Sequence, residues 1–224
     1  MKETQTIKAM FDNIAERYDF LNHLLSFFQD FYWRHVMNSE LLPAADVIVL
    51  DLATGTGDSA KGAIKRGFRV VGVDLSYKML YKTKKKVLSK NFTAVAASGY
   101  QLPYKDESFG AVTCAFGIRN MHETVSALKE INRVIKRGGK AIFLEFTMPE
   151  SPFKYVYRLY LKYFMPAIAS LFSKKDAYDY LWQSIENFPN PDVFSELLKE
   201  AGFSAAKKKA LSFGCVYVIT AYKL

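Results

Sequence analysis

The sequence predicts an α/β fold, in which a mostly parallel sheet is covered by helices on both faces. Short apolar runs alternate with amphipathic stretches between residues 47 and 146, which is the rhythm of βαβ units. The strand-like runs are apolar along their whole length, as expected for strands buried on both sides. A glycine-rich turn at residues 51–57 follows the first run, at the place where such sheets bind ligands.

The chain opens with a segment that we expect to be helical and to form a lid over residues 1–42. Ile7, Met10, Phe11 and Ile14 recur at three- and four-residue spacing, which is typical of an amphipathic helix. A second helical stretch is expected at residues 31–42, and Pro43 is expected to end it.

The remaining elements follow in order. Strands are expected at residues 47–50, 69–73, 93–96, 111–116 and 141–145, with helices at 58–66, 77–89 and 123–135. A helical insertion at 150–190 and a helix at 192–201 come next. Two closely joined strands, at 205–210 and 215–221, predict an antiparallel hairpin on the edge of a seven-stranded sheet. No linker or repeat interrupts the chain, so residues 1–224 are expected to form one domain.

The composition limits the class of protein. Half of the 224 residues are apolar and 24% are charged, which indicates a globular chain. No apolar run approaches the roughly 20 residues of a membrane span, and the polar N-terminus lacks a signal core, so a cytoplasmic location is expected. Cys114 and Cys215 lie in apolar runs and are expected to be buried free thiols. The net charge of +9 suits an anionic partner or a solvated lysine surface.

The glycine-rich turn is expected to bind a small molecule. Gly55 and Gly57 allow close backbone approach, and Asp74 follows the second strand, where an acid binds ribose hydroxyls. The turn also satisfies a dinucleotide fingerprint. Asp51 and Asp58 distinguish a dinucleotide from S-adenosylmethionine (SAM) as the ligand. Their carboxylates would repel the pyrophosphate of a dinucleotide, but they favour the cationic amino group and sulfonium of SAM.

Four blocks of the sequence resemble the ubiquinone/menaquinone biosynthesis C-methyltransferases, a family of class I, Rossmann-like SAM-dependent methyltransferases. The similarity extends from Phe11 to Lys223. The blocks are residues 11–22, the turn at 51–58, Phe116-Gly-Ile-Arg-Asn120, and residues 133–147 together with Tyr180 to Pro189. The chain departs from the family pattern at Asp30, where His is usual, and at Ser98, where Asp or Asn is usual.

The resemblance implies the site residues and the substrates. It implies a SAM site, with S-adenosylhomocysteine as product, at Tyr18, Asp51, Gly55, Thr56, Gly57, Asp74, Leu75, Ser98 and Gly99, and catalytic roles for Arg119 and Asn120. The acceptor it implies is a ring carbon of a polyprenylated quinol of the demethylmenaquinol type. Another small, soluble acceptor is the alternative. No His/Cys/Asp cluster has metal-ligand spacing, so no metal is expected.

The chemistry of a quinol acceptor requires a proton to leave its hydroxyl. Arg119 stays protonated, so we expect it to stabilise a phenolate or to hold a relaying water, although a structural ion pair is the simpler interpretation. His122 is a candidate base, but a surface position is favoured. His23 and His35 are expected to be packing or surface residues.

The insertion suggests a membrane partner. Lys154, Arg158 and Lys162 recur every four residues beside an aromatic face, so residues 153–175 are expected to contact an anionic membrane peripherally, at the inner face of the cell membrane. An ordinary capping helix is equally compatible with the pattern. No nucleic acid is expected, because the chain has no Asn/Asp-Pro-Pro-aromatic motif. A homodimer and a binding protein without catalysis stay open.

Overall fold

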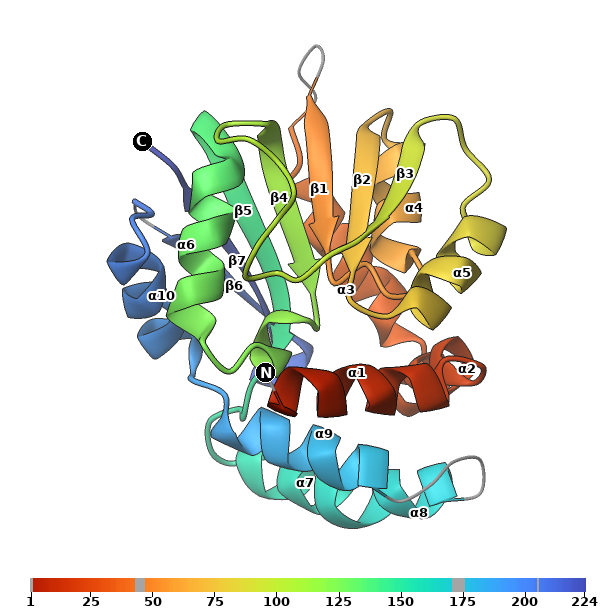
Figure 1. The fold of residues 1–224 in the computed structure, drawn as a ribbon. Coiled ribbons are helices and arrows are strands. Elements are labelled where there is room, and N and C mark those ends of the chain that lie inside the picture. The colour runs from red at the N-terminus through yellow and green to blue at the C-terminus, as the bar shows by residue number, and fades with distance from the viewer. Residues whose placement is uncertain (1, 43–46, 171–175, 205) are drawn as a thin grey trace.

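The computed structural model describes residues 2–42, 47–170, 176–204 and 206–224. Its centre is a seven-stranded sheet of order β3-β2-β1-β4-β5-β7-β6 (Figure 1). The strands are β1 (Ile48–Leu52), β2 (Arg69–Asp74), β3 (Phe92–Ala96), β4 (Phe109–Ala115), β5 (Ile135–Phe146), β6 (Ala206–Leu211) and β7 (Val216–Tyr222). The first five are parallel, and β7 pairs antiparallel with both β5 and β6. The predicted mostly parallel sheet with a terminal hairpin is confirmed, and β6 forms the edge.

Helices cover both faces of the sheet because successive strand residues point to opposite sides. Leu50 and Leu52 pack in a cluster with residues of α6 (Thr124–Val134) and α10 (Pro191–Glu200). Val49, the residue before Leu50, points to the other side and packs with residues of α3 (Gln29–Ser39) and α4 (Asp58–Lys65). The remaining crossover helix, α5 (Tyr77–Lys86), packs beside β2 and β3.

The N-terminal segment is helical as predicted, but it divides into three helices. α1 (Lys2–Ile14) is followed by α2 (Tyr18–Leu25) and then α3. α1 lies across the end of the sheet at which the parallel strands finish (Figure 1). The turn between α2 and α3 places Phe27 and Phe28 at positive φ, 51° and 61°, which is a costly backbone conformation for a side chain with a Cβ. The predicted stop at Pro43 lies outside the described residues.

β5 differs from its prediction, because it begins directly after α6 rather than at residue 141. Gly138 and Gly139 therefore lie inside the strand and do not separate two elements. A Cβ on Gly139 would lie 2.7 Å from the carbonyl oxygen of Gly110. Glycine is needed where these strands approach, and the β4–β5 register shifts at the same place, between Phe109 and Ala111.

The insertion forms a helical layer beneath α1 and α2 (Figure 1). It consists of α7 (Phe153–Leu159), a π-helical turn (Tyr160–Phe164), α8 (Met165–Ser170) and α9 (Asp176–Asn187). Leu161, Met165 and Ile185 bury themselves against Leu21 of α2. This contact fixes the insertion to the N-terminal helices. Residues 171–175, where the predicted membrane segment ends, lie outside the described residues.

Two features are absent from the described part of the chain. None of its groups of His, Cys, Asp and Glu has an arrangement that could hold a metal ion. None of its helices combines the length and the apolar character needed to cross a bilayer.

Candidate active site

The site lies where the strand order reverses. β1 and β4 are parallel neighbours, but the chain continues from β1 to β2 on one side and from β4 to β5 on the other. The turns after these two strands therefore diverge and leave a crevice at their carboxyl ends. Two adjoining cavities open there, one beside the glycine-rich turn and one beneath the insertion.

The first cavity encloses about 800 Å³, part of it open to solvent. Most of the predicted donor residues line it, namely Tyr18, Gly55, Asp74, Leu75, Ser98 and Gly99, and so does Asn120. Ile7, Lys8 and Phe11 of α1 close the opposite side. These three were not predicted individually, since their helical spacing showed an apolar face but not what it would cover.

Asp74 is held at the end of β2 by backbone amides. Its two carboxylate oxygens accept hydrogen bonds from the amides of Gly55 (2.9 Å) and Ser76 (2.8 Å). Burial raises the pKa of Asp74, although these amide bonds favour the charged form. Each oxygen keeps a further lone pair, so the carboxylate can also accept bonds from the two hydroxyls of a ribose.

Ser98 and Gly99 follow β3 on the neighbouring side of this cavity. The Ser98 hydroxyl accepts a bond from the amide of Tyr100 at 3.3 Å. A Cβ on Gly99 would lie 2.8 Å from Cε of Met121, so a larger residue would push that side chain, which also lines the cavity. The pair thus presents a small polar group and an open backbone, suited to the edge of an adenine.

Three of the predicted donor residues support the turn and do not line the cavity. Asp51 is buried, and its carboxylate accepts bonds from Thr54 (2.6 Å) and Thr113 (2.8 Å). Burial raises its pKa, so it is an internal support for the turn rather than a contact at the cavity wall. The hydroxyl of Thr56 is directed to Asp19 of α2. A Cβ on Gly57, whose φ is 91°, would lie 2.6 Å from Cγ2 of Thr83.

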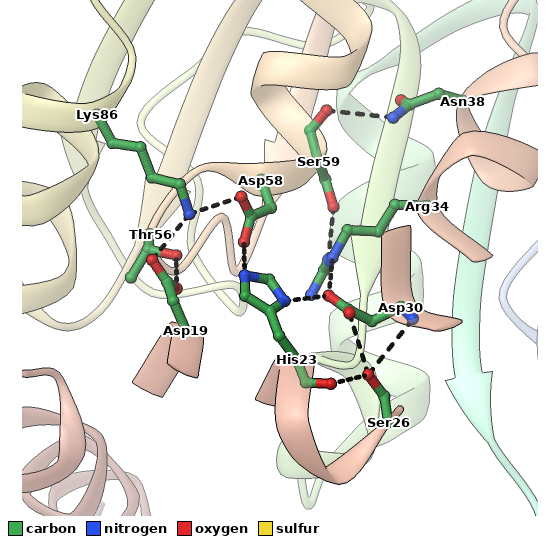
Figure 2. Close-up of polar contacts among 10 residues, drawn as sticks. All are labelled: Asp19, His23, Ser26, Asp30, Arg34, Asn38, Thr56, Asp58, Ser59 and Lys86. Atoms are coloured by element: carbon green, nitrogen blue, oxygen red, sulfur yellow. Dashed lines mark hydrogen bonds and ion pairs between the residues drawn. The ribbon is translucent and has the colours of Figure 1, made fainter. Parts of the chain in front are cut away.

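A polar network ties α2 and α3 to the glycine-rich turn (Figure 2). His23 lies between two carboxylates, with Nδ1 2.9 Å from Asp30 and Nε2 4.0 Å from Asp58. Lys86 pairs with Asp58 at 2.6 Å and with Asp19 at 2.8 Å. His23 therefore hydrogen-bonds within this polar network, while its ring also stacks on Phe31 with ring centroids 4.3 Å apart, so a polar role accompanies the expected packing. Asp30, where the family usually has His, supplies one of its partners.

The second cavity is larger and mostly apolar. It encloses about 1310 Å³, again partly open. Aromatic and aliphatic side chains from five segments line it, including Phe27, Trp33, Phe116, Phe146, Phe153, Tyr157, Tyr160, Leu181 and Phe213. Cys215 also faces it, half-buried rather than buried as expected, and burial raises the pKa of its thiol to about 11. Such a lining suits an apolar ring with an aliphatic tail.

Arg119 stands in the wall of this second cavity and forms a buried ion pair. Its Nη1 lies 2.7 Å from Oε1 of Glu145 and also donates to the carbonyl of Phe116 at 2.7 Å. Glu145 is wholly buried. Its burial raises its pKa, while Arg119 opposes that shift. Glu145 was not predicted as a site residue, although an acid inside the apolar strand 141–146 signals a buried partner.

Tyr18 and Phe116 line both cavities and form the partition between them. Asn120 lies on the donor side, and its amide donates to the carbonyl of Phe116 while its oxygen accepts from Tyr180 at 3.0 Å. His122 is exposed and contributes to neither wall. Among the described residues, the geometry thus offers two pockets that share the aromatic side chains of Tyr18 and Phe116. The first holds the Asp74 carboxylate, and the second is lined mainly by aromatic and aliphatic side chains.

The model of the ubiE/COQ5 methyltransferase family matches residues 1–223. The chain belongs to this family. Demethylmenaquinone methyltransferase of Chlorobaculum parvum is 40% identical to it over 98% of this chain and 94% of that protein. The ubiquinone/menaquinone biosynthesis C-methyltransferase UbiE of Geotalea daltonii is 38% identical, over 98% of this chain and 97% of that protein.

The fold agrees with this membership. A SAM-dependent methyltransferase from Thermotoga maritima has a TM-score of 0.71 and 20% identity, and the match covers 96% of this chain and 99% of that one. The prediction of a class I, SAM-dependent methyltransferase is confirmed. The first cavity fits SAM chemically, because Asp74 can take the ribose hydroxyls and the Ser98–Gly99 edge can take the adenine.

Proposed function

We propose that this enzyme transfers the methyl group of SAM to a ring carbon of a polyprenylated quinol of the demethylmenaquinol type. The observation that carries the proposal is the second cavity, which is apolar and aromatic and shares Tyr18 and Phe116 with the donor cavity. The names of the relatives, demethylmenaquinone methyltransferase and UbiE, support the same substrate class.

The residues suggest how the reaction proceeds. Bound SAM supplies an electrophilic methyl group on its sulfonium. The quinol ring occupies the aromatic cavity and presents a carbon to that methyl at the Tyr18–Phe116 partition, so that the two reactants are aligned. The hydroxyl proton passes to a water molecule, and Arg119 stabilises the remaining phenolate, directly or through that water. The ring carbon takes the methyl group, S-adenosylhomocysteine is the leaving group, and the hydrogen of that carbon then leaves as a proton to water, which restores the aromatic ring. Glu145 fixes the guanidinium in place at 2.7 Å, and Asn120 braces the turn that carries it.

The N-terminal helices serve as the lid of the donor site in this proposal. Ile7, Lys8 and Phe11 cover the cavity from α1, and Tyr18 covers it from α2. The ion pairs of Lys86 hold α2 near the glycine-rich turn. Closure of this layer would keep bulk water from the sulfonium and from the phenolate.

The acceptor implies contact with a membrane, at the inner face of the cell membrane. The insertion from residue 153 supports this, because Tyr155, Leu159, Tyr163 and Phe164 expose large side chains. The expected basic stripe is less regular than its spacing indicated. Arg158 pairs with Glu186 at 2.6 Å, and the π-helical turn from Tyr160 changes the angular spacing before Lys162. A homodimer stays a proposal.

The proposal is tested by incubating the enzyme with SAM labelled in its methyl group and with reduced demethylmenaquinone in vesicles. We expect labelled quinone to form. The absence of labelled quinone, with SAM binding intact, would exclude the quinol substrate but not the fold. Turnover of a soluble phenol at an equal or higher rate, without lipid, would favour the alternative of a small soluble acceptor.

A further inference from the structure

Exposed aromatic side chains gather at the mouth of the acceptor cavity. Phe27, Phe153 and Phe213 line the cavity and are also exposed, with 64% of Phe27 and 78% of Phe213 accessible. They belong to three segments far apart in the sequence: the α2–α3 turn, the start of α7 and the β6–β7 connection. We refer to these three residues, with Phe28, Val156 and Phe164, as the aromatic rim.

Ring contacts join the three segments of the aromatic rim. Phe153 stacks on Phe213 with ring centroids 4.7 Å apart. Phe27 lies 5.9 Å from Tyr160, which in turn stacks on Phe164 at 6.4 Å. The contacts form two sets, and each joins a separate segment to the insertion: Phe213 to Phe153 of α7, and Phe27 to Tyr160 of the π-helical turn.

Two of the turns that carry the rim hold phenylalanine residues in an unfavourable, left-handed backbone conformation. Phe27, Phe28 and Phe213 have φ of 51°, 61° and 56°, where glycine or asparagine is ordinary. Strain of this kind persists where the surroundings or a function maintain it. At these turns it raises apolar rings into solvent, which costs free energy in the free protein.

The charges around the rim identify the partner. The charged residues between 151 and 170 are Lys154, Arg158 and Lys162, and all are basic. The stretches 24–29 and 211–215 carry no charge. Of these three cations, Arg158 is paired with Glu186 at 2.6 Å, so Lys154 and Lys162 provide the positive charge beside the rings. Such a surface is complementary to anionic lipid, since the rings enter the boundary of the acyl chains and the lysines meet the headgroups.

We infer that the aromatic rim is a docking surface for an anionic bilayer, and that it delivers the quinol to the acceptor cavity directly from the membrane. This inference rests on the proposed function. It moves the main contact from the basic stripe of the insertion to a rim shared by three segments. The isoprenoid tail stays among the lipid chains while the ring passes between Phe27, Phe153 and Phe213 to reach Arg119.

Vesicle cosedimentation of the full chain tests the inference, with phosphatidylcholine vesicles that contain or lack phosphatidylglycerol. The test variant is Phe28→Ser with Phe164→Ser, because neither side chain lines the cavity. The matched control is Tyr81→Ser with Leu88→Ser, which removes two exposed apolar side chains beside the sheet. We expect the rim variant to bind anionic vesicles about tenfold more weakly or worse and the control to bind as the wild type does.

Two further readouts separate the outcomes. A tail-less, water-soluble quinol should be methylated equally by the rim variant and the wild type, whereas the vesicle-borne quinol should be methylated more slowly by the variant. Equal vesicle binding by the variant and the wild type would overturn the inference. A second result would also overturn the inference: a wild-type protein that sediments as a dimer and does not bind vesicles, together with a rim variant that sediments as a monomer. The rim would then be an interface between two copies of the chain. If lipid binding depends on the rim but no quinol is methylated, the rim is still a membrane-docking surface and the proposed function is rejected.

Discussion

Nη1 of Arg119 lies 2.7 Å from Oε1 of Glu145 at the wall of the apolar cavity, where the Glu145 side chain is fully buried and the Arg119 side chain is 7% exposed. The pair joins the turn after β4 to the end of β5. The same nitrogen of Arg119, Nη1, donates hydrogen bonds to the Glu145 carboxylate and to the carbonyl of Phe116. The position of the cation beside the acceptor therefore depends on a buried carboxylate.

Removal of Arg119 is expected to affect stability as well as activity. Arg119→Ala leaves the Glu145 carboxylate buried without its cation, which costs about 3–5 kcal/mol in the free energy of unfolding. Urea unfolding measures this. The double variant Arg119→Met with Glu145→Leu should recover most of the stability, because both charges are gone, yet stay inactive. A double variant as unstable as Arg119→Ala would contradict the pairing.

Arg119→Lys isolates the catalytic role. Lysine keeps the positive charge but lacks the planar fork that can bond Glu145, the Phe116 carbonyl and a phenolate together. We expect kcat to fall about 100-fold, with SAM affinity changed less than about twofold, because the guanidinium lies outside the donor cavity. Steady-state kinetics with calorimetry provide both quantities. A loss confined to SAM binding would place Arg119 on the donor side instead.

Asp74 is expected to control donor affinity. Asp74→Asn replaces one oxygen, which accepts from the Gly55 or Ser76 amide, with an amide that cannot accept. SAM binding should weaken by about 10- to 100-fold, consistent with about 1.5–3 kcal/mol for a hydrogen bond to a charged group.

Ser98→Asn is expected to have the opposite effect on SAM affinity. It supplies a longer acceptor toward the adenine, so calorimetry should show binding unchanged or tighter.

The attachment of the lid is expected to weaken in acid. Burial alone would raise the pKa of Asp19, but the bonds from Lys86 and Thr56 outweigh it and hold the pKa below the usual 3.8. Because the folded pKa is lowered, this contribution to stability is complete above pH 3.8 and is lost as the pH falls through the folded pKa. The protection factors of the α2 amides, which correct for the intrinsic pH dependence of hydrogen exchange, should therefore fall at the acidic end. Asp19→Asn should show faster exchange already at neutral pH, and an unaltered rate there would disprove the contact.

The glycine-rich turn should not tolerate a Cβ at residue 57. Gly57 has a φ of 91°, and an added Cβ would meet Thr83 and Val87 at 2.6 and 2.7 Å. We expect Gly57→Ala to reduce the free energy of unfolding by about 2–4 kcal/mol through strain and overlap. Gly67→Ala is the matched control, because Gly67 also has a positive φ, of 92°, but an added Cβ there would meet no atom within 4 Å. Gly67→Ala should cost only the backbone part, about 1 kcal/mol.

The sequence was sufficient for the order of elements and for the donor turn, because both depend on local pattern. It was insufficient where side-chain direction matters. Asp51 lies one residue before the end of β1, and its carboxylate accepts hydrogen bonds from Thr54 and from Thr113, its register partner on the neighbouring strand β4. Thr113 is 62 residues away in sequence, so no local pattern could reveal this partner.

The acceptor cavity was the least predictable part. Its wall combines Phe27, Phe116, Phe146, Phe153 and Phe213 from separate segments, and each of them alone resembles an ordinary core or surface residue. They meet because α2–α3, the insertion and the β6–β7 connection converge at one end of the sheet. Glu145 had a weak signal as an acid in an apolar strand, but its partner depends on how the turn after β4 folds back over β5.

The most direct test of the central proposal is where the transferred methyl group is attached. A single turnover with SAM labelled with carbon-13 in its methyl group, and with demethylmenaquinol in vesicles, should give one product. Its labelled methyl should have the nuclear magnetic resonance shift and the mass of a methyl group on a quinone ring carbon. A labelled methyl on oxygen, or labelled SAM left intact beside unaltered quinol while the enzyme still binds both, would contradict the assignment of the two cavities.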